Sequence, residues 1–277
     1  MPLKPFTFVL ISDIHFGTDK LHDGVYKKLP SRALSLTRYM VNRINNELRP
    51  SFVVQLGDAI EDEDAEVDEE NYSTIIEAFK PLTMPIYHVV GNKEQVNLDL
   101  DQIRTVLKYP KLYYSFDSGD FHCAVLFSTS KSESEINIDE EQRKWLEADL
   151  NTTKKPTMIF LHHPLDDQDL SDSFWYEDKP EQCFVKERMA VREIIARSGK
   201  VLAVFNGHVH RNNLHSHDDV PYITLQSLVE NVTEKSKTPS ETFAVVTVTT
   251  AEIRVEIEGI NPTEYRISTA GKIRTKT

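Results

Sequence analysis

Five short segments of the chain carry side chains that commonly bind metal ions, and each follows an apolar run of β type. In chain order they are Ser12-Asp13-Ile14-His15, Leu56-Gly57-Asp58, Val90-Gly91-Asn92, Leu161-His162-His163-Pro164 and Asn206-Gly207-His208-Val209-His210. A single Asp-x-His or Gly-Asp segment is more common as a turn or a helix cap. Five such segments in order predict a metal site assembled from the ends of strands.

The positions of these donors allow them to share one crevice. Side chains two apart on an extended chain face the same way, as Asp13 and His15 would, and also His208 and His210. The carboxyl ends of parallel strands line the crevice in which open α/β sheets bind ligands. Oxygen and nitrogen donors without a thiolate favour manganese, iron or zinc.

The elements needed to position these segments can be read from the hydrophobic pattern. Strands are predicted at 6–12, 52–56 and 85–90, with helices at 31–48, capped by Ser31, and at 71–79. This alternation is typical of a mainly parallel sheet covered by helices. Farther on, the pattern predicts a hairpin of 113–116 with 122–127, helices at 140–150 and 185–197, and strands at 157–161, 201–206, 222–225, 242–249 and 252–257.

The composition indicates an ordinary globular chain. It has 277 residues, of which 39% are hydrophobic and 27% charged, and its net charge is -12. The negative charge argues against binding to long nucleic acids, but a metal can still attract a small phosphorylated substrate. Cys123 and Cys183 are far apart and predict no disulfide framework. Without a signal peptide or an apolar run of membrane length, we expect a cytoplasmic protein that does not associate with membranes.

Two segments outside the donor set have two readings each. Residues 61–70 hold eight acidic side chains, which predict a solvated loop before a helix rather than a tract that captures metal. Residues 165–182 form a long acidic stretch containing Phe174, Trp175 and Tyr176. This stretch either overhangs the site after His162 or is pinned to the core by its aromatic side chains.

The ordered set closely resembles the motifs of the calcineurin-like metallophosphoesterases. It comprises Asp13-x-His15, Gly57-Asp58, Gly91-Asn92-x-Glu94, His162 and Gly207-His208-x-His210, and the resemblance spans about residues 6–258. It implies an α/β fold, a four-layer αββα sandwich of two mixed sheets flanked by helices, with two metals at one edge. We expect one domain over residues 1–260, followed by a tail or terminal strand at 261–277.

The resemblance also implies a role for each donor. Asp13, His15 and His210 would hold one metal, Asn92, His162 and His208 the other, and Asp58 would bridge the two. The metals would be divalent or mixed-valence ions of manganese, iron or zinc. Two such ions lower the pKa of a bridging water, so that hydroxide can attack phosphorus at neutral pH. The expected activity is phosphoester hydrolysis, with Asp58, Asn92, Lys93 and His208 in catalytic roles.

Lys93 departs from the family pattern, which has a histidine after the asparagine of Gly91-Asn92. Three alternatives follow. Lys93 acts as a cationic clamp on phosphate, which we favour. Otherwise another group, such as His163 or His22, acts as the acid, or the site binds substrate and turns over slowly. Lys93 would donate a proton well only if its pKa fell, as nearby dications and desolvation would favour.

Several further residues are candidates for supporting positions around the metals. Because adjacent side chains alternate, His163 should point away from His162 and support or pack. Glu94 should cap or orient its turn, and His88 should lie in the core. His22, Trp175 and Tyr176 are possible substrate contacts, as are His215 and His217 on a loop after the fifth segment.

The segments around 31–58 and 85–92 look most like a branch that contains cyclic-nucleotide phosphodiesterases and ADP-ribose or CDP-alcohol pyrophosphatases. That similarity predicts a small phosphodiester, phosphoanhydride or phosphomonoester as substrate. The alternative is an interaction scaffold of the same fold with weak or no turnover, which the change at Lys93 supports. Complete ligands favour the enzyme. The oligomeric state is not predicted.

Overall fold

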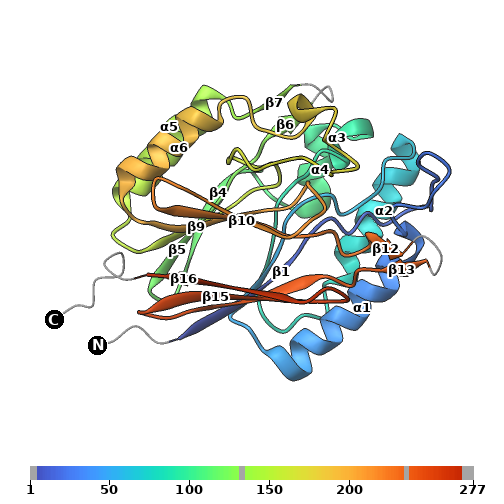
Figure 1. Ribbon diagram of the computed structural model, residues 1–277, viewed down its shortest axis with the longest axis horizontal. Helices are drawn as coiled ribbons and strands as arrows, with labels where there is room; N and C mark the ends of the chain where they lie inside the picture. Colours follow the sequence, from blue (N-terminus) through green and yellow to red (C-terminus); the bar gives the residue numbers. More distant parts are fainter. Residues whose placement is uncertain (1–4, 131–134, 234–236, 270–277) are drawn as a thin grey trace.

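Two six-stranded sheets packed face to face form the centre of the molecule, and helices cover the outer face of each (Figure 1). The computed structural model describes residues 5–130, 135–233 and 237–269. Both sheets mix parallel and antiparallel neighbours. The predicted four-layer αββα sandwich is therefore confirmed.

The first sheet has the strand order β16-β15-β14-β1-β2-β3. Its parallel part consists of β1 (Phe6–Ile11), β2 (Phe52–Gln55) and β3 (Ile86–His88). Its antiparallel part consists of β14 (Phe243–Val248), β15 (Glu252–Glu258) and β16 (Thr263–Ser268).

The second sheet has the order β10-β11-β9-β8-β5-β4. Four central strands are parallel: β5 (Phe121–Val125), β8 (Thr157–Phe160), β9 (Val201–Asn206) and β11 (Val220–Thr224). The antiparallel edges are β4 (Tyr114–Ser118) and β10 (Asn213–His217). Two small pairs lie outside the sheets, β6 (Thr129–Ser130) with β7 (Ile136–Asn137) and β12 (Asn231–Thr233) with β13 (Thr238–Pro239).

The outer layers are helical. Beside the first sheet lie α1 (Ala33–Arg43), α2 (Ala65–Ala78) and α4 (Leu100–Leu107), and beside the second lie α5 (Glu140–Thr152) and α6 (Arg188–Ser198). Shorter turns are α3 (Glu94–Asn97), η1 (Pro30–Arg32), η2 (Ile44–Leu48) and η3 (Pro180–Gln182).

Aromatic side chains fill the space between the two sheets. Phe8 stacks on Phe52 with ring centroids 5.0 Å apart, and it meets the edges of Phe160 and Phe205 from the opposite sheet. All four rings are buried. Large rigid rings contribute much buried area, and this packing holds the strands of both sheets in a common arrangement.

The helix expected at 31–48 is present, as η1, α1 and the π-helical turn η2 in direct succession. Two details of the predicted elements were wrong. Ser31 does not cap this helix; its amide and hydroxyl both donate to Asp19. The helix expected from residue 71 begins at Ala65, where Asp64 accepts hydrogen bonds from the first-turn amides.

The far end of the chain contributes a strand to the first sheet. β16 pairs with β15 from Thr263 to Ser268, and Tyr265 and Ile267 pack toward the core between the sheets. The remainder of the expected tail, residues 270–277, lies outside the described residues. Among the helices that are described, none combines the length and the apolar character needed to cross a bilayer.

Candidate metal centre

The seven predicted metal donors all lie in loops that closely follow strands of the two sheets. Asp13 and His15 follow β1, Asp58 follows β2, Asn92 follows β3, His162 follows β8, and His208 and His210 follow β9. Asn92 is half-buried and the other six are buried. The packing of one sheet on the other brings these loops together at one site.

Asp13, His15 and His210 form a first group of donors. His15 Nε2 lies 2.9 Å from His210 Nε2 and 3.8 Å from Asp13 Oδ1. His210 Nε2 lies 3.4 Å from Asp13 Oδ1. One ligand atom from each of the three residues lies within 4.8 Å of the other two, which is close enough to share one ion.

Asn92, His162 and His208 form a second group beside the first. His162 Nε2 lies 3.1 Å from Asn92 Oδ1 and 3.2 Å from His208 Nδ1. Asp58 lies between the groups, with Oδ1 3.4 Å from His162 Nε2 and Oδ2 3.8 Å from His15 Nε2. Each oxygen of the Asp58 carboxylate thus faces one group, as a bridging ligand requires.

Five of the donors have a left-handed backbone conformation. Asp13, His15, Asp58, His208 and His210 all have φ between 49° and 71°. The alternation expected for an extended chain was therefore the wrong reason for Asp13 and His15 to share a face, because both lie in turns beyond the strand. Such conformations cost about 1–3 kcal/mol each and concentrate at functional sites.

Two glycines in these loops allow neighbouring loops to approach closely. A Cβ on Gly91 would collide with the backbone nitrogen and the carboxylate of Asp58, and one on Gly207 would collide with the Ser12 hydroxyl and the Asp13 carboxylate. The motif glycines thus protect the space that Asp13 and Asp58 occupy.

Two carboxylates outside the predicted donor set hold the histidines of the first group. His15 Nδ1 lies 3.1 Å from Glu61 Oε2, and His210 Nδ1 lies 2.7 Å from Glu230 Oε2. Lys28 Nζ pairs with Glu61 Oε2 at 2.6 Å. Each carboxylate accepts the Nδ1 proton and leaves Nε2 facing the site.

The acidic tract at 61–70 therefore differs from the solvated loop that was predicted. Glu61 is only 3% exposed, and the tract continues into α2 from Ala65. The run of acidic residues drew attention to the segment that contains Glu61, but no pattern in the sequence distinguished Glu230 or Lys28 from other charged residues. Both come close to the site only through the folding of distant loops.

Backbone carbonyls hold the histidines of the second group. His162 Nδ1 lies 2.8 Å from the Leu56 oxygen, and His208 Nε2 lies 3.0 Å from the Gln182 oxygen. Tyr176 Oη lies 3.3 Å from His208 Nδ1. Because Tyr176 and Gln182 belong to the stretch after His162, that stretch overhangs the site, while Phe174 is 44% exposed and does not pin it to the core.

The buried charges influence one another strongly. Burial would raise the pKa of Asp13, but a hydrogen bond with His210 and the charges of His162 and His210 lower it to about 2. Burial would lower the pKa of His162, but Asp58 raises it to about 9. Glu230 and Asp13 likewise raise the pKa of His210 to about 9, against the effect of burial.

This donor set suits two dications. Each of the four imidazoles has one nitrogen held by a carboxylate or carbonyl oxygen and the other directed at the neighbouring donors, as metal-binding histidines do. His15 Nε2 and His210 Nε2 are 2.9 Å apart, so a proton or a cation must offset the repulsion of their lone pairs. Carboxylate, amide and imidazole donors match manganese, iron or zinc.

Lys93 is held at the edge of the site by an acidic partner. Its ammonium contacts Asp62 Oδ1 at 2.5 Å, and its backbone nitrogen donates to Asp58 Oδ1 at 2.9 Å. Burial lowers the pKa of Lys93, but the charges of Glu61 and Asp62 outweigh burial and raise it. The protein's own charges therefore keep Lys93 a cation and oppose its use as a proton donor.

Glu94 and His163 lie against the motif loops, and His163 also borders the pocket over the donors. Glu94 accepts hydrogen bonds from the amides of Ala59 and Gly91, so it ties together the loops after β2 and β3. Burial and the charge of Asp58 raise the pKa of Glu94 to about 7. His163 Nδ1 lies 2.7 Å from Ser128 Oγ, and the His163 ring is 4.3 Å from that of His208.

A pocket of about 460 Å³ opens over the donors. Besides five of the donors and other side chains, its lining includes Lys28, Lys93, Lys179, Trp175 and Tyr176. His22 also borders it and meets the edge of Trp175 with ring centroids 4.9 Å apart. His88 lies in the core, while His215 and His217 lie on β10 and do not border this pocket.

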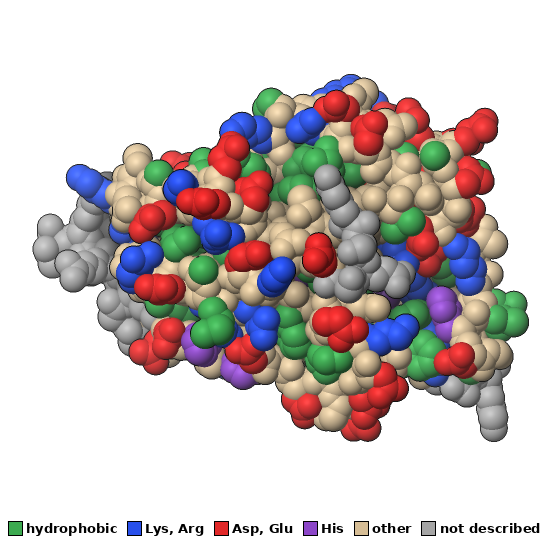
Figure 2. All heavy atoms as spheres, turned by 90° about the horizontal axis from the view of Figure 1, so that it is seen from above, with side chains coloured by type: hydrophobic (Ala, Val, Ile, Leu, Met, Phe, Trp, Pro, Cys, Tyr) green, Lys and Arg blue, Asp and Glu red, His purple; other side chains and the backbone are tan. Residues whose placement is uncertain are grey.

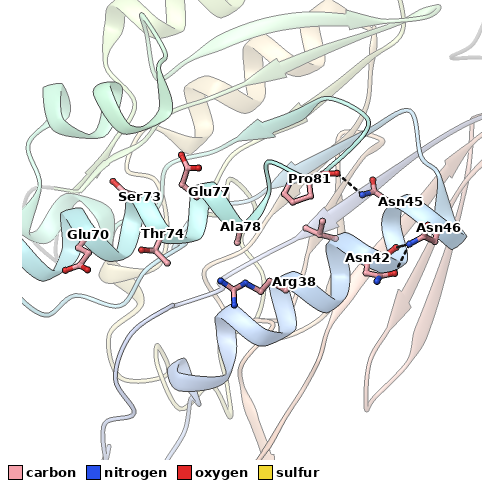
Figure 3. Close-up of a pocket in the computed structure, with 11 residues that line it drawn as sticks. Arg38, Asn42, Asn45, Asn46, Glu70, Ser73, Thr74, Glu77, Ala78 and Pro81 are labelled. Carbon is pink, nitrogen blue, oxygen red and sulfur yellow. Dashed lines mark hydrogen bonds between the residues drawn. The ribbon is translucent and has the colours of Figure 1, made fainter.

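A larger hollow of about 740 Å³ lies on the outer side of the first sheet, between α1 and α2 (Figure 3). Figure 3 shows Arg38 and Asn42 on α1, and Ser73, Thr74 and Glu77 on α2, among the residues that line it. Its lining includes none of the motif residues and none of the clustered histidine and aspartate donors. The pocket over the histidines, rather than the larger hollow, is the candidate active site.

Comparisons with known proteins identify a family and a shared fold. The sequence model of the calcineurin-like phosphoesterase family matches residues 6–212. A dimetal phosphatase from Danio rerio has a similar structure, with a TM-score of 0.75, 18% identity, and 97% of this chain and 99% of that chain covered. GAP50, the anchor in the inner membrane complex of Plasmodium, aligns with a TM-score of 0.59, 16% identity and 97% and 90% coverage. No curated protein matches at a significant level.

Proposed function

The chain belongs to the calcineurin-like phosphoesterase family, and we propose that it is a metal-dependent hydrolase of a small phosphoester. One observation carries this proposal. Two groups of buried donors from both sheets meet at Asp58, which directs one carboxylate oxygen to each group. An interaction module has no need for buried, mutually repelling imidazoles in strained turns.

One metal would be held by Asp13, His15 and His210. The second would be held by Asn92, His162 and His208, and Asp58 would bind both. Bound there, the two ions would supply Lewis acidity and an activated water at neutral pH. The chain itself orients each imidazole through Glu61, Glu230 and the carbonyls of Leu56 and Gln182. The ammonium of Lys93, paired with Asp62, adds a positive charge at the edge of the pocket, where it would stabilise phosphate oxygens.

The pocket supports a small substrate that joins phosphate to an organic group. Its volume of about 460 Å³ suits a compact ligand, and lysines with two aromatic side chains border it. On one face of the molecule, acidic and basic side chains alternate and no broad basic patch forms (Figure 2). We propose a phosphodiester, phosphoanhydride or phosphomonoester within the cyclic-nucleotide phosphodiesterase or ADP-ribose and CDP-alcohol pyrophosphatase-like branch, acting in the cytoplasm and without a nucleic-acid partner.

A substrate screen with manganese tests the proposal. Protein stripped by a chelator and reloaded should contain two metals per chain and hydrolyse p-nitrophenyl phosphate or bis-p-nitrophenyl phosphate. Cyclic nucleotides, nucleotide-sugar-type pyrophosphates and phosphomonoesters then identify the class. Asp58→Asn should lower the rate by about 10²-fold or more, whereas His215→Ala on β10 should leave it unchanged. A protein that binds no metal and hydrolyses nothing would instead be a scaffold, the alternative that Lys93 left open.

A further inference from the structure

One imidazole in the wall of the pocket has a nitrogen that nothing in the described chain satisfies. His163 is fully buried and borders the pocket, yet its Nε2 has no hydrogen-bond partner among the described residues. An unpaired buried polar atom is destabilising, and such atoms in native proteins call for an explanation. A ligand that arrives in the pocket would provide one.

The other nitrogen of His163 indicates where its proton lies. Nδ1 is 2.7 Å from the hydroxyl of Ser128, which is itself fully buried. Among the described residues, this is the only hydrogen bond that the Ser128 hydroxyl makes. If the Ser128 hydroxyl only accepted a hydrogen bond from Nδ1, its own proton would have no acceptor in this buried site. Donation from Ser128 Oγ to Nδ1 avoids that cost and places the imidazole proton on Nε2.

The neighbouring donors also favour a proton on Nε2 rather than a metal. His163 lies with His162 and His208 in a group whose ligand atoms are within 4.8 Å of one another. Asp58, Asn92, His162 and His208 already provide four protein donors on that side. A catalytic metal keeps positions open for water and substrate, and a fifth protein donor would fill one of them.

We propose that His163 is a substrate-binding residue whose Nε2–H donates to an oxygen of the bound phosphoryl group. The proposal rests on the proposed phosphoesterase function and adds a residue to its site. It also assigns Ser128 a positioning role, since its hydroxyl selects the tautomer. Lys93 and His163 would then contact phosphate differently, one as a cation with a fixed charge and the other as a neutral, directional donor.

Two amide substitutions test the roles of Nδ1 and Nε2 of His163 separately. His163→Gln places an amide near the former Nε2 and keeps a donor there, whereas His163→Asn places it near Nδ1 and removes that donor. Inorganic phosphate is the probe, titrated by calorimetry into manganese-loaded protein. Metal content per chain and thermal unfolding are measured for each variant, with Ser128→Ala as a third variant and His217→Asn on β10 as the control.

The expected result is that all variants keep two metals. His163→Asn should weaken phosphate binding by about 10–100-fold, as loss of a hydrogen bond to an anion does. His163→Gln should retain most of the affinity, Ser128→Ala should show an intermediate loss, and His217→Asn should match the native protein.

Two results would overturn the proposal while leaving the phosphoesterase function intact. A fall from two metals to one in His163→Asn would show that His163 is a ligand. Equal phosphate affinity in the Asn and Gln variants, at equal metal content, would show that it only packs. A native protein that binds neither metal nor phosphate would overturn both proposals.

Discussion

Each histidine of the donor set is held by its own hydrogen-bond acceptor, and the kind of acceptor differs between the two groups. Glu61 and Glu230 accept from His15 and His210, whereas His162 and His208 are held by backbone carbonyls. A carboxylate makes an imidazole a stronger donor than a carbonyl does, because it favours positive charge on the ring. Single substitutions behind the site should therefore alter metal binding without touching a metal.

Glu230→Gln should weaken manganese binding by about 10–100-fold. Glutamine keeps the size of the side chain but removes the charge that lies 2.7 Å from His210 Nδ1. Competition with a fluorescent chelator measures the affinity, and Glu193→Gln on the exposed face of α6 is the matched control. Equal affinities in the two variants would mean that Glu230 does not support the ligand.

Lys93→Ala should lower kcat/KM for aryl phosphates by about 10²-fold, with the largest loss for poor leaving groups. The reason is that Lys93 supplies a positive charge at the edge of the pocket and does not supply a proton. Lys93→Arg should keep most of the rate, and Lys93→His tests whether an acid can improve it. If Lys93→Ala hydrolyses esters with poor leaving groups at the native rate, Lys93 is not a clamp.

At the scale of elements, short loops after the strands determine where the donors lie. Five donors have positive φ, and Gly91 and Gly207 leave room for the carboxylates of Asp58 and Asp13. The strands end before the donors begin, so the loops rather than the pleat of the sheet aim them. These loops should tolerate little added volume.

Gly91→Ala should destabilise the protein by about 1–3 kcal/mol and reduce the metal content, since its Cβ would displace Asp58. Gly119→Ala is the matched control. Gly119 lies in the β4–β5 turn with φ 56° and open space around it. The substitution should therefore lower stability without changing the metal content. Chemical unfolding and metal analysis of both variants provide the measurement. Full metal content in Gly91→Ala would refute the assigned role of this glycine.

A second element-scale contact links the edge of the second sheet to α5. His122 on β5 lies 2.8 Å from Asp117 on β4 and 2.8 Å from Asp149 on α5. Burial lowers the pKa of His122, but the two carboxylates outweigh it and raise the pKa. The stabilisation is therefore fully present below the unfolded-state pKa of about 6.5 and is lost as pH rises through the folded-state pKa.

His122→Gln should remove this pH dependence. The free energy of unfolding is measured between pH 5.5 and pH 8.5, and the native protein should lose more stability over that range than the variant. Asp120→Asn, in the adjacent turn and exposed, serves as the control. Parallel curves for His122→Gln and the native protein would contradict the assignment.

At the scale of the whole molecule, the candidate metal site lies where loops from the two sheets come together. Phe8, Phe52, Phe160 and Phe205 pack the sheets against each other, and the loops at their ends then enclose seven donors. Without metal, buried imidazoles are close to one another, and His162 and His210 have pKa values of about 9. Binding must displace their protons.

Manganese binding should therefore release close to two protons per chain at pH 7, where both rings are protonated. The affinity should rise as pH increases toward 9, by about tenfold per pH unit for each proton displaced. Calorimetry in two buffers with different ionisation enthalpies counts the protons. Equal heats in the two buffers would show that the imidazoles are already neutral.

The sequence by itself determined the order of the main elements and selected the seven candidate donors, while the αββα class followed from the resemblance of their motifs to a known family. The elements and the donors depend on local patterns: apolar runs, glycines before short polar side chains, and histidines two apart. It also identified Lys93 as the departure from the family motif. Such information is local because each segment carries its own signal.

Only the tertiary structure decided which groups hold the donors in place and which side chains line the pocket over them. Glu230 and Gln182 are 20 and 26 residues from the histidines they contact, and no spacing rule connects them. The left-handed turns, the pairing of Lys93 with Asp62 and the unpaired nitrogen of His163 also depend on how distant loops pack. A local sequence pattern indicates which element a segment can form. The hydrogen-bond partners and the charged neighbours of a side chain depend on how all the segments pack in three dimensions.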